Sequence, residues 1–484
     1  MLIKKDQDLI QSYLEDNSNI PRGYAIGVAI PENESEIVSF MRETSATHTP
    51  VTISGGGTGT TGGRVPYGGY ILSLANFNHI KEIGSDYAAV EPGVIYQDLE
   101  KELSAKKLLF PPNPTETTSF IGGNIATNAS GSRTYLYGAT RNYITGLRVV
   151  LSDGETLVLN RGKHFADNND MFNLTLPSGR KLSFRRPAYT VTDIKNAAGY
   201  FSKPGMDLID LFIGSEGTLG IITEITLNVI PGFKNLCAFF VFLAREQDAL
   251  SMVQEITQKP SHHINPLAIE YFDSNSLRLI GGKYPRLPQD AASAIYLEQD
   301  IPADEEETLS SWLKLFERYN VPEDHAWFGQ TAKDLSFYHD IRHSLPERIN
   351  ELVKQHHHIK LSSDIAVPRR HLDKIIAVYK QYFLPLGIPY YIFGHIGDAH
   401  LHTNLLPDTA SQVKQAGEIY MDIMKEAVNL GGTISAEHGI GKIKYEYLRI
   451  MYGAAGIEEM KRAKKALDPA GILNQGNIFP CHTC

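Results

Sequence analysis

Pro50-Val-Thr-Ile-Ser-Gly-Gly-Gly-Thr-Gly-Thr-Thr-Gly-Gly63 decides the fold, because a short apolar strand runs directly into a loop with six glycines in nine positions. Glycine has no Cβ, so the consecutive backbone N–H groups of such a loop stay accessible and can wrap a pyrophosphate. The loop lacks the following helix and later acidic residue of a Rossmann fingerprint, and it lacks the Gly-Lys-Ser/Thr ending of a P-loop. The stretch predicts another kind of phosphate-binding loop, although a glycine run alone is also typical of a flexible linker.

Two further glycine-rich motifs follow along the chain. They are Ile121-Gly-Gly-Asn-Ile-Ala-Thr-Asn-Ala-Ser-Gly131 and Gly214-Ser-Glu-Gly-Thr-Leu-Gly220. A linker does not explain three such motifs, each of which lets a backbone approach something closely. The set therefore favours ligand binding.

The rest of the chain alternates short strands and helices, which indicates an α+β protein of two or three domains. Residues 1–20 are predicted to form a short amphipathic helix. A polar excursion at about 160–204 has few hydrophobic runs and reads as a lid or surface insertion. A new series of strands and helices begins after Pro231-Gly232, and it predicts an antiparallel sheet covered by helices on one face. We expect domains at 1–232 and 233–444, followed by a C-terminal helical segment at 445–484 that packs back on the first domain.

Composition limits the partners and the compartment. With a net charge of -9 and a pI near 6.0, the chain lacks the basic surface that a nucleic-acid partner requires. The N-terminus has no apolar signal core, and no stretch approaches a membrane span of about 18 to 20 apolar residues. Three cysteines make no disulfide framework, and we interpret the Cys481-His-Thr-Cys484 pair as a tail rather than a metal or redox site. We expect a cytoplasmic protein, with peripheral membrane contact left open.

The segment His395-Ile-Gly-Asp-Ala-His-Leu-His-Thr-Asn404 concentrates three imidazoles in eight residues, and Glu437-His438 follows later. Alternation along a strand puts His400, His402 and Asn404 on one face, and the Gly-Asp turn lets His395 fold back towards them. Neutral imidazoles with one carboxylate suit zinc, and also manganese or iron. The pattern predicts a metal site with an open position and a base beside it, although a lone histidine is usually a satisfied core or surface residue.

The three glycine motifs, in this order and spacing, resemble the FAD-binding domain of the vanillyl-alcohol oxidase and p-cresol methylhydroxylase family. The histidine segment, Glu437-His-Gly-Ile-Gly441 and Leu467-Asp-Pro-Ala-Gly-Ile-Leu-Asn474 are similar to its glycolate oxidase subunit, D-lactate dehydrogenase and D-2-hydroxyglutarate dehydrogenase branch. The resemblance covers nearly the whole chain. It implies a two-subdomain FAD-binding domain, an α+β substrate (cap) domain, and FAD contacts from Ser54, Gly55, Gly56, Gly57, Thr58, Gly59, Thr60, Pro112, Gly122, Gly123, Thr127, Asn128, Ser130, Gly131, Tyr137, Gly138, Glu216, Gly217, Gly220, Ile221, Ile222 and Asn474.

The resemblance also implies a mechanism, in which His395, His402 and Glu437 hold a divalent metal and His438 is the base. A metal-bound 2-hydroxy acid has an acidified hydroxyl, which a neutral histidine can deprotonate while hydride passes to FAD. The products would be a 2-oxo acid and reduced FAD. Because residues 54–64 contain no histidine, the resemblance implies noncovalent FAD.

Three more residues are implied as ligands of the substrate carboxylate: Arg342, Lys360 and Asn404. An isolated Arg or Lys is usually a surface charge, so only the resemblance assigns these roles to Arg342 and Lys360. Asn404 could instead form a hydrogen bond at the end of its strand. The branch usually has Gly-Asn where this chain has Ala399-His400, so His400 could add a ligand or reshape the pocket.

Three rival functions stay open: an ether-lipid synthase-like flavoenzyme of the same fold, a metal-dependent hydrolase, and an inactive flavin-binding subunit. The sequence leaves the hydroxy acid undetermined. It also leaves open the electron acceptor, which could be a flavoprotein, quinone, cytochrome or oxygen. A homodimer is compatible with the chain, whose oligomeric state the sequence does not determine.

Overall fold

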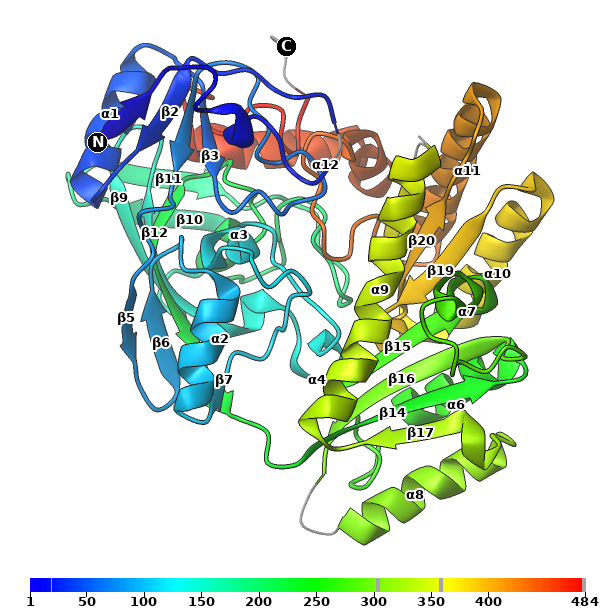
Figure 1. Ribbon diagram of the computed structural model, residues 1–484. Helices are drawn as coiled ribbons and strands as arrows, with labels where there is room; N and C mark the ends of the chain where they lie inside the picture. Colours follow the sequence, from blue (N-terminus) through cyan, green and yellow to red (C-terminus); the bar gives the residue numbers. More distant parts are fainter. Residues whose placement is uncertain (19, 302–304, 357–359, 481–484) are drawn as a thin grey trace. The chain divides into compact units, whose positions relative to one another are not determined.

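The computed structural model describes residues 1–18, 20–301, 305–356 and 360–480, and it divides into two units (Figure 1). Unit 1 comprises residues 1–130, 138–232 and the chain from Glu437 onward. Unit 2 comprises residues 131–137 and 233–436. The predicted tail pair, Cys481 and Cys484, lies outside the described residues.

Unit 1 contains two main sheets. A four-stranded sheet has the order β1-β2-β4-β3, with β2, β4 and β3 parallel, and a five-stranded antiparallel sheet has the order β5-β6-β12-β8-β9. Together they form the two-subdomain arrangement that the family resemblance implies. The strands are β1 (Leu2–Lys4), β2 (Gly27–Ile30), β3 (Val51–Ser54), β4 (Tyr70–Ser73), β5 (Ile80–Ile83), β6 (Tyr87–Val90), β7 (Leu108–Leu109), β8 (Ile144–Val150), β9 (Thr156–Asn160), β10 (Met171–Thr175), β11 (Lys181–Arg185), β12 (Ile221–Asn228) and β13 (Ile230–Pro231).

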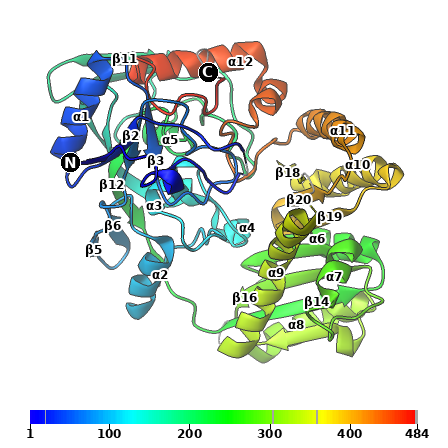
Figure 2. The same ribbon diagram turned by 45° about the horizontal axis from the view of Figure 1, so that its top comes forward.

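The C-terminal part of the chain completes unit 1. Its helices are α1 (Glu34–Ala46), α2 (Tyr96–Ala105), α3 (Ile121–Ala126), α5 (Ile209–Phe212) and α12 (Tyr445–Leu467), and α12 lies along β11 (Figure 2). Beyond α12, the Val51 N–H donates to the Ile472 carbonyl, and the Asn474 N–H donates to Val51 in return. The last segment therefore lies beside β3, the strand that carries the glycine loop.

Unit 2 is built on one seven-stranded antiparallel sheet with the order β17-β14-β16-β15-β19-β20-β18. The histidine segment begins directly after β19 and runs through a 3-10 turn into β20, the strand that pairs with β19. The elements are α4 (Thr134–Tyr137), β14 (Leu236–Leu243), α6 (Glu246–Gln258), β15 (Ala268–Asp273), α7 (Ser274–Gly281), β16 (Ser293–Asp300), α8 (Glu305–Arg318), β17 (Ala326–Gly329), α9 (Ala332–His356), β18 (Leu361–Ala366), α10 (Leu372–Phe383), β19 (Tyr390–Gly394), β20 (His400–Leu405) and α11 (Ala410–Asn429).

Helices cover both faces of this sheet, so the prediction of helices on one face was wrong. On β14, Phe240 packs against Tyr338 of α9, while its neighbour Phe239 packs against Trp312 of α8. Successive strand residues point to opposite faces, so the two helices lie on opposite sides. The signal was present in Leu236-Cys-Ala-Phe-Phe-Val-Phe-Leu243, because an unbroken apolar strand is typical of a sheet buried on both faces.

The N-terminal prediction was also wrong. Residues 1–20 form no α-helix in their described part: Leu2–Lys4 is strand β1, which pairs antiparallel with β2, and Gln11–Tyr13 is a single 3-10 turn. Among the residues that the structure describes, no helix is long and apolar enough to cross a bilayer.

Phe240→Ala tests the packing of unit 2. The Phe240 ring is fully buried, with its centroid 5.0 Å from Phe242 and 5.4 Å from Phe272, so its loss should destabilise unit 2 by about 3 to 5 kcal/mol. The chain's two tryptophans, Trp312 and Trp327, both lie in unit 2, so tryptophan fluorescence during urea unfolding reports on this unit alone.

Leu384→Ala is the control, because the Leu384 side chain is exposed. It should leave the urea midpoint nearly unchanged. Equal midpoint shifts in the two variants would contradict the packing described.

Candidate functional site

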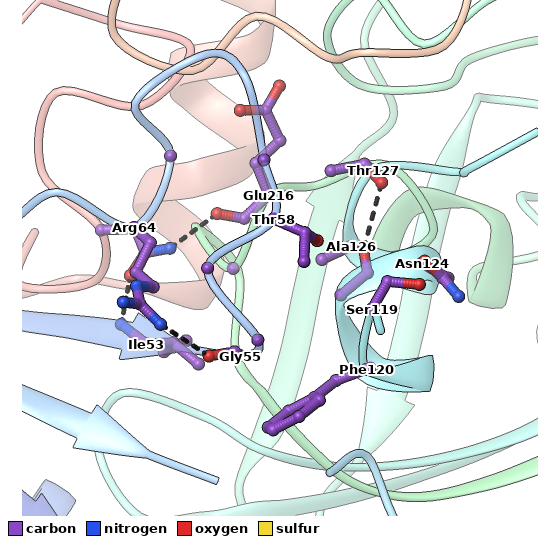
Figure 3. Close-up of a pocket in the computed structure, with 18 of the residues that line it drawn as sticks. Ile53, Gly55, Thr58, Arg64, Ser119, Phe120, Asn124, Ala126, Thr127 and Glu216 are labelled. Carbon is purple, nitrogen blue, oxygen red and sulfur yellow. Dashed lines mark hydrogen bonds between the residues drawn. The ribbon is translucent and has the colours of Figure 1, made fainter. Parts of the chain in front are cut away.

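The glycine loop follows β3 directly and forms one wall of a pocket in unit 1 (Figure 3). The Arg64 side chain closes the loop from behind, and its Nη1 atom donates to the Gly55 carbonyl at 3.1 Å. Gly57 has a φ of +78°, and a Cβ there would lie 2.4 Å from the Arg64 guanidinium carbon. Gly57 therefore needs to be glycine for two reasons, its backbone conformation and its contact with Arg64.

The pocket encloses about 1080 Å³ between protein atoms, part of it open to solvent. All three glycine motifs contribute to its lining, as does the chain near the C-terminus. Of the residues predicted to contact FAD, those that line it are Gly55, Gly56, Gly57, Thr58, Gly59, Gly122, Gly123, Thr127, Glu216, Gly217, Gly220, Ile222 and Asn474. The structure thus brings together segments separated by hundreds of residues in the sequence.

Other predicted FAD contacts do not line this pocket. Two of them, Gly131 and Tyr137, belong to unit 2, whereas the pocket belongs to unit 1. The remaining ones are Ser54, Thr60, Pro112, Asn128, Ser130, Gly138 and Ile221. Ser54 and Ile221 are strand residues buried in the core of unit 1.

The pocket also has lining residues that the sequence did not single out, among them Asp16, Pro92, Ser119, Phe120 and Asn477. Ser119 and Phe120 directly precede the second glycine motif, whereas Asp16, Pro92 and Asn477 lie outside all three motifs. His438, which was predicted only as a base, also lines the pocket.

The pocket residues fit the FAD that the family resemblance implies. A Cβ on Gly59 or Gly123 would meet no protein atom within 4 Å, so these two positions border open space. A Cβ on Gly56 would lie 3.3 Å from the Phe120 ring and from the Thr118 carbonyl. Backbone therefore lines this space closely, as a pyrophosphate-binding loop requires.

Glu216 ties the segment around His438 to the pocket. Its carboxylate accepts hydrogen bonds from the backbone N–H groups of Ile440 at 2.6 Å and Gly441 at 2.7 Å. Its own carbonyl accepts from the Asn474 side chain, whose oxygen accepts from the Ile53 N–H. Glu216 thus joins the third glycine motif to the chain that follows Glu437 through its carboxylate, and to β3 through its backbone carbonyl and Asn474.

Burial raises the pKa of Glu216 to about 7, although the two N–H donors and the nearby Lys442 and Lys444 oppose this shift. The carboxyl group therefore changes its charge near neutral pH.

Within unit 1, Glu437 is held by a residue that the sequence analysis missed. The buried Lys195 ammonium lies 2.8 Å from Oε2 of Glu437, and the Ser130 hydroxyl donates to the same oxygen at 3.4 Å. Nε2 of His438 lies 3.5 Å from Oε1. Lys195 belongs to the predicted insertion at 160–204, so one function of that segment is to neutralise and orient this carboxylate.

In unit 2 the structure brings the three imidazoles together. Ring centroids are 5.1 Å apart for His395 and His400, 5.6 Å for His395 and His402, and 4.6 Å for His400 and His402. A 3-10 turn at Ile396–Asp398 returns the chain, and Ala399 closes it in the left-handed region with φ +49°. One ring nitrogen of each histidine lies within 4.8 Å of the others, close enough for one ion to bind all three.

Two buried carboxylates, which no sequence motif marks, hold two of these rings. Nδ1 of His395 lies 2.5 Å from Oε1 of Glu270, and Nε2 of His400 lies 2.9 Å from Oδ1 of Asp364. Glu270 and Asp364 are each 1% exposed. Glu270 lies on β15, which pairs with β19, and Asp364 lies on β18, which pairs with β20. Both residues are far from their histidine partners in the sequence, so only the folded sheet reveals the pairs.

Glu270 also binds Arg342, whose Nε atom donates to Oε2 at 2.9 Å. Burial raises the pKa of Glu270, but the charges of Arg342 and His395 outweigh it and lower that pKa to about 2. Glu270 thus stays ionised and orients the Arg342 guanidinium on α9.

The other predicted carboxylate ligands, Lys360 and Asn404, also lie in unit 2. Lys360 donates to the Asn350 side chain at 2.8 Å, and burial lowers its pKa. Asn404 is buried on β20, two residues beyond His402 and on the same strand face. The predicted metal ligand Glu437 is the first residue of unit 1 after Ala436, whose N–H donates to the Asp364 carbonyl of β18.

The pKa of Glu216 predicts a pH-dependent stability. Because the folded-state pKa of Glu216 is raised above the ordinary 4.5, the protonated carboxyl group favours the folded state. This contribution to the free energy of unfolding is fully present below pH 4.5 and is lost as the pH rises through about 7. Thermal unfolding should therefore show that wild type loses on the order of 2 to 3 kcal/mol relative to Glu216→Gln between pH 5 and pH 8.

Because the amide introduced by Glu216→Gln cannot titrate, the other effects of the substitution cancel from this comparison. A stability difference between the two chains that stays constant from pH 5 to pH 8 would show that Glu216 is ionised throughout.

Two family matches cover most of the chain. Residues 25–160 match the FAD binding domain family, and residues 234–478 match the family of FAD linked oxidases, C-terminal domain. The first match contains the glycine loop and the second motif, and the second match contains the histidine segment, Glu437 and Asn474.

Several curated relatives match nearly the whole chain. The chain is 30% identical to the glycolate oxidase subunit GlcD of Bacillus subtilis (strain 168), over 93% of this chain and 88% of that protein. It is 29% identical to the D-lactate dehydrogenase of Anaerostipes hadrus (92% and 87%) and 28% identical to the D-2-hydroxyglutarate dehydrogenase of Stutzerimonas stutzeri (strain A1501) (98% and 95%).

A solved structure of alkyldihydroxyacetonephosphate synthase has the same fold, with a TM-score of 0.69 at 16% identity over 98% of this chain and 82% of that one. The prediction of family and fold class is confirmed. The chain belongs to the family of FAD-linked oxidases.

Proposed function

We propose that this chain oxidises a D-2-hydroxy acid of the lactate, glycolate or 2-hydroxyglutarate type to the 2-oxo acid, with noncovalent FAD in the pocket of unit 1. The observation that carries the proposal is the position of His438, which lines the same pocket as the three glycine motifs. A candidate base thus borders the predicted flavin site. The names of the relatives, which are glycolate, D-lactate and D-2-hydroxyglutarate enzymes, support this substrate class.

FAD would be held by backbone groups of the glycine loop and by Gly123, Thr127 and Asn474. When bound, it supplies the acceptor for the hydride of the substrate carbon. The absence of histidine from residues 54–64 supports dissociable rather than tethered FAD.

A divalent cation would be held by His395, His402 and Glu437, with zinc as the first choice and manganese or iron as alternatives. When bound, it supplies positive charge that acidifies the substrate hydroxyl. Glu270 supports this assignment, because its hydrogen bond to Nδ1 of His395 leaves Nε2 as the ligand atom.

His438 then accepts the hydroxyl proton as a general base. It is partly exposed, so a substrate can reach it, and its neighbour Glu437 lies 3.5 Å away and stabilises the positive charge that the ring acquires. Arg342 would bind the substrate carboxylate with its planar fork of donors, assisted by Lys360 and Asn404. Glu270 fixes the orientation of that fork.

The two rival enzyme functions receive less support. The ether-lipid synthase likeness is 16% identical and concerns the fold, whereas the hydroxy-acid enzymes match at 28 to 30%. A metal-dependent hydrolase would not need the FAD binding domain that residues 25–160 match. We further propose a cytoplasmic location and a flavoprotein, quinone or cytochrome as electron acceptor.

Anaerobic spectroscopy of the FAD-loaded chain tests the reaction. D-lactate, D-glycerate and D-2-hydroxyglutarate are added separately, next to their L-isomers and glycolate, with and without chelator. One D-acid should bleach the flavin absorbance, its L-isomer should not, and chelator should slow the bleaching. His438→Ala should slow it by about 100-fold or more, the usual contribution of a general base.

His79→Ala is the matched control, because His79 is an exposed histidine of the same unit that lines no part of the pocket. It should bleach at the wild-type rate. Bleaching of His438→Ala at the wild-type rate, with normal FAD content, would exclude His438 as the base.

Gly123→Leu tests the location of FAD. A side chain there enters open space in the pocket, so the variant should fold normally and yet fail to retain FAD. Gly417→Leu is the control, because Gly417 on α11 is also a helical glycine whose Cβ would meet no protein atom within 4 Å. Flavin absorbance and circular dichroism of the purified variants give the two readouts. Stoichiometric FAD in Gly123→Leu would place the cofactor elsewhere.

A further inference from the structure

We propose that His400 is a third imidazole ligand of the metal, so that unit 2 alone presents a three-histidine site selective for zinc-like cations. The inference deepens the metal site of the proposed function and rests on it.

The spacing of the three imidazole rings fits a single bound ion. Three imidazoles at tetrahedral angles around one ion, each bound at about 2.1 Å, would have ring centroids roughly 5 Å apart. The observed separations of 4.6, 5.1 and 5.6 Å bracket this value. His400 lies closer to each of the other two rings than they lie to each other, so a site built from His395 and His402 includes it.

The ring nitrogens of the three histidines also lie close together. One nitrogen of each imidazole lies within 4.8 Å of one nitrogen of the other two, a separation that allows a single ion to contact all three. The ring planes are inclined by 43° to 75°, which is also the ordinary edge-to-face packing of aromatic rings. The nitrogen positions therefore indicate the ion site, and the ring planes do not.

The carboxylate partner of His400 orients the ring for metal binding. Asp364 binds its Nε2 atom, which leaves Nδ1 as the nitrogen for the metal and fixes the tautomer with the proton on Nε2. Asp364 is itself fixed, because the Ser435 hydroxyl donates to Oδ2 at 2.8 Å. The pair repeats the arrangement of His395 with Glu270, and such carboxylate–histidine pairs are typical of metal ligands.

Metal preference follows from the ligand set. Two imidazoles and a carboxylate suit several cations, whereas a third imidazole beside them favours borderline cations such as Zn²⁺ over Mn²⁺, which prefers oxygen ligands. His400 therefore shifts selectivity towards zinc.

Metal titration of the FAD-loaded full chain, freed of metal by a chelator, tests the assignment. Zn²⁺ and Mn²⁺ affinities are measured in competition with a chromophoric chelator. His400→Asn should weaken Zn²⁺ binding by about 100-fold or more and Asp364→Asn by about 10-fold, whereas Mn²⁺ binding should change little. His79→Asn, an exposed histidine outside the cluster, should leave both affinities unchanged.

X-ray absorption of the zinc-loaded wild-type chain gives a readout that needs no variant. Scattering from three imidazoles is expected, and scattering from only two would overturn the proposal even if His400→Asn fails to fold. Unchanged Zn²⁺ affinity in a folded His400→Asn would overturn it as well.

These outcomes differ from a failure of the proposed function. If no D-2-hydroxy acid bleaches the flavin while His400→Asn still loses zinc, the oxidation is refuted and the three-histidine site stands. If a D-acid bleaches the flavin and the variant keeps its zinc affinity, only the role of His400 is refuted.

Discussion

The Glu216 carboxylate is the constraint on which the position of the Glu437-His438 pair in unit 1 depends. It is buried, and it accepts the N–H groups of Ile440 and Gly441, which follow the Glu437-His438 pair. Gly439, between that pair and the two donors, has a φ of +76°, and a Cβ there would lie 2.9 Å from the carboxylate. A side chain at Gly439 would therefore push the chain off Glu216. The placement of the candidate base thus depends on one carboxylate and one glycine.

A similar use of buried carboxylates recurs in unit 2. Glu270 joins His395 to Arg342, and Asp364 joins His400 to Ser435. A buried charge is costly unless it is paired and hydrogen-bonded, so each carboxylate depends on all its partners. In return, each one restricts the orientation of the side chains that would contact metal or substrate. In unit 1 the roles are reversed, because the buried Lys195 ammonium restricts the orientation of the Glu437 carboxylate.

Much of this could be predicted from local sequence. Glycine runs after strands marked the pocket walls, and alternation marked the face that carries His400, His402 and Asn404, because both patterns act over a few residues. The sequence did not predict the roles of Lys195, Glu270 and Asp364. Their partners are 36 to 242 residues away in the sequence, and no short motif encodes such a contact. The prediction of helices on one face of the unit 2 sheet was wrong, although the unbroken apolar run of β14 is typical of a strand that is buried on both faces.

The most direct measurement is a crystal structure of the chain loaded with FAD, zinc and a 2-oxo acid product. The account predicts a pyrophosphate against the glycine loop, an isoalloxazine ring beside His438, and zinc on His395, His402 and Glu437 with His400 as a further ligand. A flavin bound outside the pocket of unit 1, or a His438 ring remote from both flavin and product, would contradict it.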